Sequence, residues 1–283
     1  MARRRISEQP TSRLAIWARR LALFSLAATV IAVVIVRSGA LDIVPALSTL
    51  AGALALALVA ILLAFAAGVV IWTEGIGGVR EAVTALLIGL VLIAYPLYLG
   101  VKAYRLPAIY DVTTDPIDPP RFVAIARLRP RDANPVTYAG LHIAELQRKA
   151  YSDIEPDLTT ATPQEAYDAV LKVIAKRKWH IVDARPPQGA ATPRDGLIEA
   201  IARTPILSFR DDVAVRVRAT PGGARIDVRS ASRYGRHDLG ANAARVRALI
   251  EDVDDVLSAP ATEKKQPAPK PTQAAGKGNS VKR

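Results

Sequence analysis

The segment between Ser230 and Asn242 contains the side chains of this sequence that are best suited to bind a ligand. These residues are Ser230, Ser232, Arg233, His237, Asp238 and Asn242. A helix N-terminus favours anions, and an arginine beside it can hold a phosphate or carboxylate with its planar fork. The segment therefore predicts a site for an anionic ligand, without a cofactor.

The same residue types have a structural interpretation, which the sequence leaves open. Ser, Asp and Asn cap helices, and Gly235 and Gly240 permit tight turns. Arg233 has two candidate partners, Asp211 and Asp212. In this interpretation the arginine forms a buried ion pair and binds no ligand.

An envelope hydrolase that uses the Ser232–Asp238 loop is the catalytic alternative. His237 and Asp238 are adjacent, a spacing that rarely aligns a base with its orienting acid, and no Gly-x-Ser-x-Gly motif occurs. The chain has no cysteine, which excludes thiol catalysis and cysteine zinc sites. His142 and His180 are scattered, so we expect no metal site. The sequence favours a binding protein over an enzyme.

A segment rich in proline and aspartate, residues 107–135, precedes these motifs. Prolines at this density prevent a continuous helix, so we expect an extended strap over residues 103–135. Asp111, Asp115 and Asp118 have the oxygen ligands that calcium prefers, but the spacing is not that of an EF-hand. Turn formation is the favoured role of these aspartates.

A β-hairpin is the clearest element that positions the Ser230–Asn242 segment. Valines alternate with Ala214 and two arginines over residues 213–218, and apolar residues alternate with charged ones over 225–229. A turn centred on Pro221 and Gly222 pairs Val217 with Ile226 and Arg216 with Asp227. The outer face of this hairpin is rich in arginine, which suits either a solvated sheet face or a surface for anions and lipid headgroups.

Two helices and two more strands complete the predicted domain. Thr162-Pro163-Gln164-Glu165 forms a capping box before a helix that ends near Lys178, and a second helix runs from about Leu239 to Leu257. Strands are expected at Trp179–Val182 and Leu197–Ala202, on either side of a Pro186–Pro193 loop. The sequence predicts an α+β domain over residues 136–258, with a four-stranded antiparallel sheet and two main helices.

Several motifs together resemble a bacterial protein family. They are Asp211-Asp212-Val213, Ser-Ala-Ser-Arg at 230–233, Asp-Leu-Gly at 238–240 and Asn242. The chain resembles the domain-of-unknown-function family numbered fourteen-ninety-nine over about residues 109–257. Residues 111–115, 119–122 and 151–156 are similar to its membrane-anchored branch. The resemblance implies the domain boundaries and no activity.

The first hundred residues contain three long uncharged runs, residues 21–36, 43–73 and 82–101. About 20 apolar helical residues cross a bilayer, so we expect spans at about 17–37, 45–72 and 81–101 in a transmembrane region over 1–102. Six arginines precede the first run, which predicts a cytoplasmic N-terminus and a periplasmic domain at the bacterial inner membrane. Cleavage of the first run as a signal peptide would leave the domain on the same side.

The formal net charge of +12 is not evenly spread along the chain. Residues 103–258 carry 23 cationic and 21 anionic side chains, so the domain is nearly neutral and nucleic-acid binding is not expected. The basic tail, residues 259–283, is predicted to be disordered. The predicted partners are the lipid bilayer and an envelope protein or anionic ligand. A structural subunit of a membrane complex is the remaining alternative.

Overall fold

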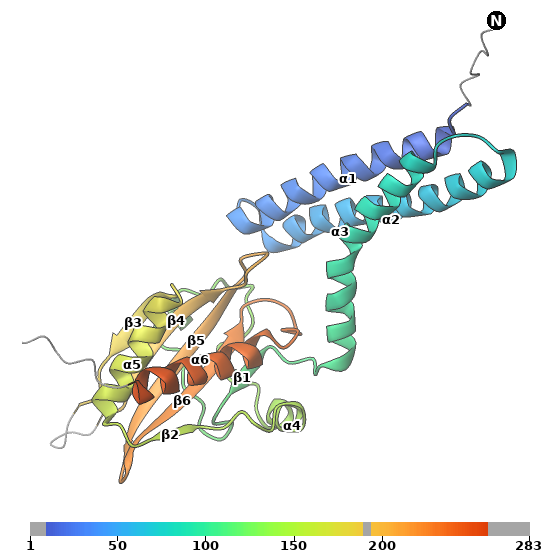
Figure 1. The fold of residues 1–283 in the computed structure, drawn as a ribbon. Coiled ribbons are helices and arrows are strands. Elements are labelled where there is room, and N and C mark those ends of the chain that lie inside the picture. Colours follow the sequence, from blue (N-terminus) through green and yellow to red (C-terminus); the bar gives the residue numbers. More distant parts are fainter. Residues whose placement is uncertain (1–9, 189–193, 260–283) are drawn as a thin grey trace, which may run out of the picture.

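The computed structural model describes residues 10–188 and 194–259, which form a bundle of three long helices and an α+β domain (Figure 1). The bundle consists of α1 (Arg13–Ser38), α2 (Ile43–Glu74) and α3 (Val79–Arg105). Apart from Ala259, the predicted disordered tail lies outside the described residues, and the predicted Pro186–Pro193 loop lies partly outside them.

Each bundle helix is long and apolar enough to cross a membrane, and each contains one of the three predicted spans. Small side chains mediate the contacts between these helices. The buried positions are almost all alanine, including Ala18 and Ala22 of α1, Ala60 and Ala64 of α2, and Ala85 of α3. A Cβ atom at Gly89 would lie 2.4 Å from Cγ1 of Ile61, so this close approach requires glycine.

Helix α3 leaves the bundle and bends toward the domain (Figure 1). Pro96 lies inside this helix, where it removes one backbone hydrogen bond and bends the chain. The second half of α3, which carries Tyr98 and Lys102, therefore lies at the junction between the bundle and the domain. We call the end of the bundle where α1 ends and α2 begins the domain-side end.

The domain contains a six-stranded antiparallel sheet, in the order β1-β6-β5-β4-β3 with β2 also paired to β6. The strands are β1 (Asp111–Thr113), β2 (Asp157–Thr159), β3 (His180–Arg185), β4 (Gly196–Arg203), β5 (Arg210–Thr220) and β6 (Gly223–Ser232). The prediction of four strands was wrong because β1 and β2 were missed. Both are three-residue segments that pair through the backbone, and such segments are too short to show a side-chain period.

The predicted hairpin register is confirmed. Val217 is opposite Ile226, and Arg216 is opposite Asp227. The capping box is also confirmed, because Thr162 accepts a hydrogen bond from the Glu165 backbone while the Glu165 side chain accepts one from Thr162 N. This box begins α5 (Pro163–Lys176), and the second predicted helix is α6 (Ala241–Ser258).

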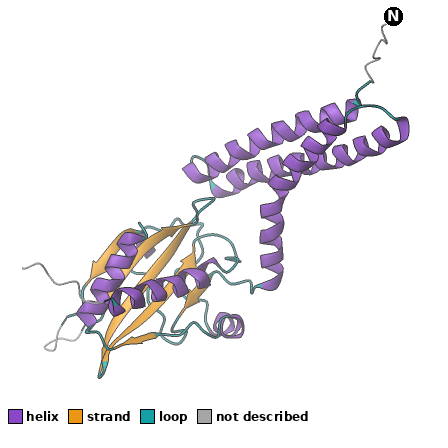
Figure 2. Cartoon of the chain, in the orientation of Figure 1, coloured by secondary structure: helices purple, strands orange, loops and turns teal. Residues whose placement is uncertain are grey.

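The two faces of the sheet are covered differently (Figure 2). Helices α5 and α6 pack on one face around a large apolar core that includes Val173, Ile226 and Leu249. Residues 114–136 lie against the other face, where Phe122 and Ile125 pack on Ala214 and Ala231. The predicted strap is therefore part of the folded domain. It contains a single 3-10 turn, η1 (Ile125–Arg127), and is followed by α4 (Leu141–Ala150), a helix that the sequence analysis did not identify.

Candidate functional site

The predicted site residues extend from β6 through a loop into the start of α6, and they do not form one cluster. Successive side chains of a strand point to opposite faces of a sheet. Ser230 and Ser232 therefore face α6, while Arg233 lies on the side of the strap. His237 and Asp238 lie in the connecting loop, beside the end of α3.

A buried hydrogen-bond network contains three of the predicted residues. Ser230 Oγ lies 2.8 Å from Asn242 Oδ1, and Asn242 Nδ2 donates to Ser232 Oγ at 3.0 Å. Arg245, which the sequence analysis missed, donates to Ser230 Oγ at 2.8 Å and forms an ion pair with Asp211. Burial raises the pKa of Asp211, and Arg245 opposes this shift. The network joins β6 to α6 and leaves Ser230 and Asn242 with no exposed surface.

Arg233 is paired with Asp212, one of the two partners left open by the sequence. Arg233 donates through Nε at 3.0 Å and Nη2 at 2.8 Å to Asp212 Oδ1. Arg129 of the strap donates to the other oxygen, Oδ2, at 2.6 Å. The register explains this choice, because Asp212 is opposite Ala231 and shares a face with Arg233, whereas Asp211 is opposite Ser232.

The loop before α6 is held by its own side chains. Asp238 accepts hydrogen bonds from the backbone N–H groups of Gly240 and Asn242, at 2.9 and 2.8 Å, and thereby caps the helix. Burial raises the pKa of Asp238, while these two hydrogen bonds lower it.

The imidazole of His237 is held between two backbone segments. Its Nδ1 accepts a hydrogen bond from Leu239 N at 2.9 Å, so Nε2 carries the proton. Nε2 faces the carbonyl oxygens of Ala103 and Leu106, each at 3.2 Å. Both imidazole nitrogens thus contact backbone, and neither is free to activate Ser232.

A cavity of about 380 Å³ lies between this loop and the domain-side end of the bundle, and we call it the junction cavity. Its walls come from the start of α2, the second half of α3, the loop between β4 and β5, and the loop between β6 and α6. Apolar side chains form most of the surface, including Leu47, Leu99, Ile206 and Phe209. Of the six predicted residues, Ser232, His237 and Asp238 line this cavity.

Two cations line the junction cavity, and neither has an ion pair among the described residues. Lys102 of α3 lies 5.7 Å above the ring of Tyr98, and Arg210 at the start of β5 is exposed. The two carboxylates at the cavity, Asp211 and Asp238, are already engaged by Arg245 and by the N-terminus of α6. The charged side chains left for a ligand are therefore cationic.

The arginine-rich outer face of the hairpin does not form an open anion surface. The strap brings three aspartates onto it, so that Asp111 pairs with Arg229 at 2.6 Å, Asp115 with Arg225 at 2.6 Å and Asp118 with Arg216 at 3.0 Å. Asp227 of β6 completes the charge balance with Arg216, Arg218 and Arg225. Among the residues that the structure describes, no group of three or more acidic or histidine side chains could hold a metal ion.

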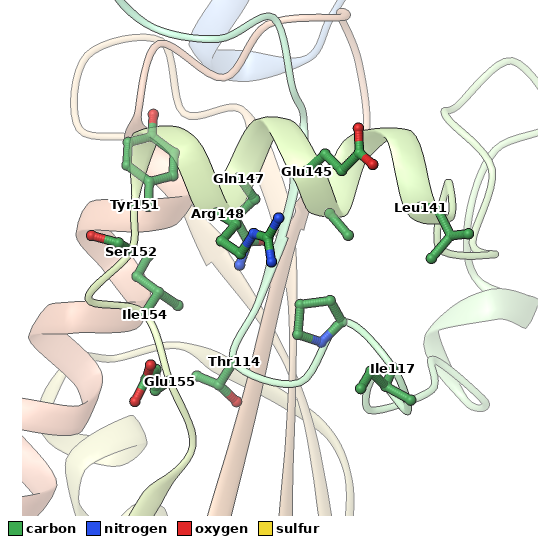
Figure 3. A pocket seen from close by; sticks show the side chains of 12 residues that line it. Thr114, Ile117, Leu141, Glu145, Gln147, Arg148, Tyr151, Ser152, Ile154 and Glu155 are labelled. Atoms are coloured by element: carbon green, nitrogen blue, oxygen red, sulfur yellow. The ribbon is translucent and has the colours of Figure 1, made fainter.

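A second cavity, of about 420 Å³, lies below α4 and is distant in sequence from the predicted site residues (Figure 3). Glu145, Gln147 and Arg148 of α4 line it together with Thr114 and Ile117 of the strap. The Gln147 amide acts as a strand partner, because its Oε1 accepts from Thr113 N at 3.0 Å and its Nε2 donates to Thr113 O at 2.7 Å. The Gln147 side chain thus takes the place of a neighbouring strand and satisfies the backbone N–H and C=O groups of Thr113 in β1.

The fold defines the class of protein: an α+β domain attached to three candidate membrane helices. A sequence model of the family described as a protein of unknown function (DUF1499) matches residues 111–253, and the chain belongs to this family. The matched range runs from β1 into α6, and the resemblance to the family itself is confirmed. No curated protein and no solved structure matches the chain.

Sequence reasoning found the loop before α6 but missed the other walls of the cavity. The sequence analysis did not single out Arg210, which differs from the hairpin arginines only in that the strap aspartates pair with them and not with it. One signal was present in the sequence. Residues 204–209, Thr-Pro-Ile-Leu-Ser-Phe, form an apolar connection between two strands, where polar turn residues are usual.

Proposed function

We propose that this protein is an integral protein of the bacterial inner membrane that holds its DUF1499 domain at the periplasmic surface. The domain binds an anionic ligand that also has an apolar part, and the junction cavity is the binding site. The ligand chemistry is that of a phosphate or carboxylate joined to a hydrocarbon group. A membrane lipid and a soluble amphiphile both have this chemistry.

The observation that carries the proposal is the contrast between Arg210 and its neighbours on the hairpin. Arg216, Arg218, Arg225 and Arg229 each form an ion pair with an aspartate. Arg210 lines the junction cavity and has no ion pair among the described residues. Because its guanidinium is not engaged by a carboxylate, Arg210 is available to bind an anion through charge-assisted hydrogen bonds at the mouth of an apolar cavity.

The composition of the cavity supports an amphiphile over a small inorganic anion. Leu99 and Phe209 form apolar walls, while Lys102 and Arg210 provide two cationic groups. The cavity also adjoins the candidate membrane helices, so a ligand from the bilayer could reach it without crossing water. No observation favours the hydrolase or the structural-subunit alternative in the same specific way.

The test uses the full chain in a nonionic detergent and three probes. Dihexanoyl phosphatidylglycerol supplies an anion with short acyl chains, glycerol 1-phosphate supplies the anion alone, and dihexanoyl phosphatidylcholine has no net charge. Isothermal titration calorimetry measures the affinity of each. We expect dihexanoyl phosphatidylglycerol to bind more tightly than the other two. A stronger response to glycerol 1-phosphate would point to a soluble anion as the ligand.

Matched variants locate the binding site. Losing a hydrogen bond to a charged group costs about 1.5–3 kcal/mol, so Arg210→Ala should weaken binding at least about tenfold, and Lys102→Ala should also weaken it. Arg203→Ala is the control, because Arg203 is opposite Arg210 in the β4–β5 register and does not line the cavity. Equal affinities for the Arg210→Ala and Arg203→Ala proteins, or no binding of any probe, would refute the proposal.

A further inference from the structure

The connection between β4 and β5, residues 204–209, is a second feature of the junction. Four of its six residues are apolar: Pro205, Ile206, Leu207 and Phe209. Ile206 exposes 42% of its surface, and Pro205 is also exposed. A hairpin loop of a soluble domain normally presents polar residues to water, so this composition needs an apolar or interfacial environment.

Three of the five backbone N–H groups of this loop donate hydrogen bonds within the loop. Thr204 N donates to Phe209 O at 2.9 Å, and Ser208 N donates to Thr204 O at 3.1 Å. Phe209 N donates to the Thr204 hydroxyl at 2.9 Å. Few backbone donors therefore need water, which suits a segment that lies in a medium of low polarity.

A residue of the bundle satisfies two of the remaining carbonyl groups. Arg37, in the last turn of α1, donates through Nη1 to the carbonyl oxygens of Pro205 at 2.5 Å and Ile206 at 2.7 Å. Figure 1 accordingly places the loop at the end of α1. Because α1 is a candidate membrane helix, this contact sets the loop at the level where that helix leaves the apolar region.

Aromatic and cationic side chains surround the loop. Tyr95, Tyr98 and Lys102 of α3 line the junction cavity together with Pro205 and Ile206. Tyrosines and snorkelling lysines concentrate at the headgroup level of a bilayer. The loop thus lies beside side chains of the kind that form an interfacial belt.

We infer that the Thr204–Phe209 loop is a membrane-interface anchor whose apolar side chains insert among the lipid headgroups and upper acyl chains. The partner of this surface is the bilayer itself. The anchor and α3 attach the domain at two separate points, which fixes its orientation relative to the membrane. The inference does not depend on the ligand proposed for the junction cavity.

The absence of cysteine in the chain permits a direct depth measurement. The full-length Ile206→Cys protein is labelled with a nitroxide and reconstituted in vesicles of phosphatidylcholine and phosphatidylglycerol. Gly222→Cys is the matched control, because it lies in the turn at the opposite end of β5, about 34 Å away for an eleven-residue strand. The space around Gly222 is open, so the label fits there. Leu207→Cys provides a second position in the loop if a label at 206 prevents reconstitution.

Electron paramagnetic resonance then compares collisions of the nitroxide with oxygen, which enters the bilayer, and with a water-soluble nickel chelate. We expect the labels at 206 and 207 to be several-fold more accessible to oxygen relative to the chelate than the label at 222. Equal ratios at the loop and at the control would overturn the inference. That result would leave the calorimetric test of the junction cavity unaffected, so the two proposals fail separately.

Discussion

The two faces of the domain sheet are stabilised by opposite means, although the same two strands contribute to both. On the side covered by helices α5 and α6, strands β5 and β6 present valine and isoleucine, and the core there is apolar. Toward the strap they present arginine and aspartate, and the strap supplies further acidic partners. Period-two alternation thus produces a mainly hydrophobic layer on one side and a layer rich in ion pairs on the other.

The comparison teaches that an arginine-rich strand face need not be a ligand surface. Burial makes the ionic face depend on complete pairing, because an unpaired buried charge is far more costly than an absent one. Arg229 is 2% exposed, and its partner Asp111 is 1% exposed. Burial raises the pKa of Asp111, while Arg229 opposes this shift. The ion pair therefore has to offset the cost of desolvating the Asp111 carboxylate.

Arg229→Ala should give the largest effect. It removes hydrogen bonds to Asp111 at 2.6 and 3.0 Å and a ring contact with Phe122 at 4.5 Å, and it leaves a buried carboxylate alone. We expect a loss of about 3–5 kcal/mol in the free energy of unfolding. Urea unfolding of the full chain measures it, followed by the fluorescence of Trp179, the tryptophan that packs against the domain core.

A double substitution separates the two contributions of that ion pair. Asp111→Leu combined with Arg229→Met removes both charges and restores apolar volume, so it should recover most of the lost stability. A single Arg229→Ala variant that loses less than about 1 kcal/mol would show that the strap face tolerates unpaired charge. In that case the contrast between the two faces would not hold.

Arg233→Ala should have a smaller effect, although Arg233 is just as buried. Asp212 keeps Arg129 as a partner at 2.6 Å, so the carboxylate does not become unpaired. We expect a loss of about 1.5–3 kcal/mol, the range for a hydrogen bond to a charged group. Arg233→Lys should also be destabilising, because it keeps the charge but loses the planar fork. Urea unfolding again provides the measurement.

The shared carboxylate makes a sharper test possible. Arg129→Ala with Arg233→Ala leaves Asp212 alone, so the double variant should cost more than the sum of the two single variants. Unchanged unfolding in the Arg233→Ala and Arg233→Lys proteins, together with lost anion binding, would instead assign Arg233 to a ligand site.

The sequence predicted those parts of the fold that have a side-chain signature. The alternation from Val213 to Val228 fixed the hairpin register, and the capping box at Thr162 fixed the start of α5. The short strands β1 and β2 have no such signature, because three residues are too few for a period and their pairing uses backbone groups. Helix α4 was missed as well. Its N-cap residue is Gly140, which has no side chain that could mark the start of a helix in the sequence.

The candidate site was predictable only in part, for a related reason. The loop before α6 could be identified from its residue types, but a cavity depends on which distant segments meet. Lys102 and Arg210 are far apart in the sequence, and no local pattern joins them. Pairing is equally non-local: Asp111 neutralises Arg229, 118 residues away, and this contact removes the hairpin face from consideration as an anion surface.

The smallest expected effect concerns two carboxyl groups that face each other at the edge of the helix-covered side. Burial raises the pKa of Asp157, and the nearby Asp254 raises it further. The pKa of Asp254 is also raised, by burial first. A raised acidic pKa means that the folded state binds the proton more tightly, so this stabilisation is complete below the ordinary value of 3.8 and is lost as the pH rises through the raised values.

Asp254→Asn removes one charge of this pair, so it should flatten the decline in stability as the pH rises above 3.8. At neutral pH the variant should equal the parent protein or exceed it by up to about 0.5 kcal/mol, the scale of a surface substitution. Asp153 is the internal reference, because a hydrogen bond from Arg247 lowers its pKa and its contribution is lost as the pH falls. Urea unfolding at a series of pH values compares the two proteins, and the difference between their curves cancels the Asp153 contribution. Parallel curves from pH 3 to pH 7 would show that the two carboxyl groups do not interact. This edge would then tolerate carboxylates without a cationic partner, which the strap face should not.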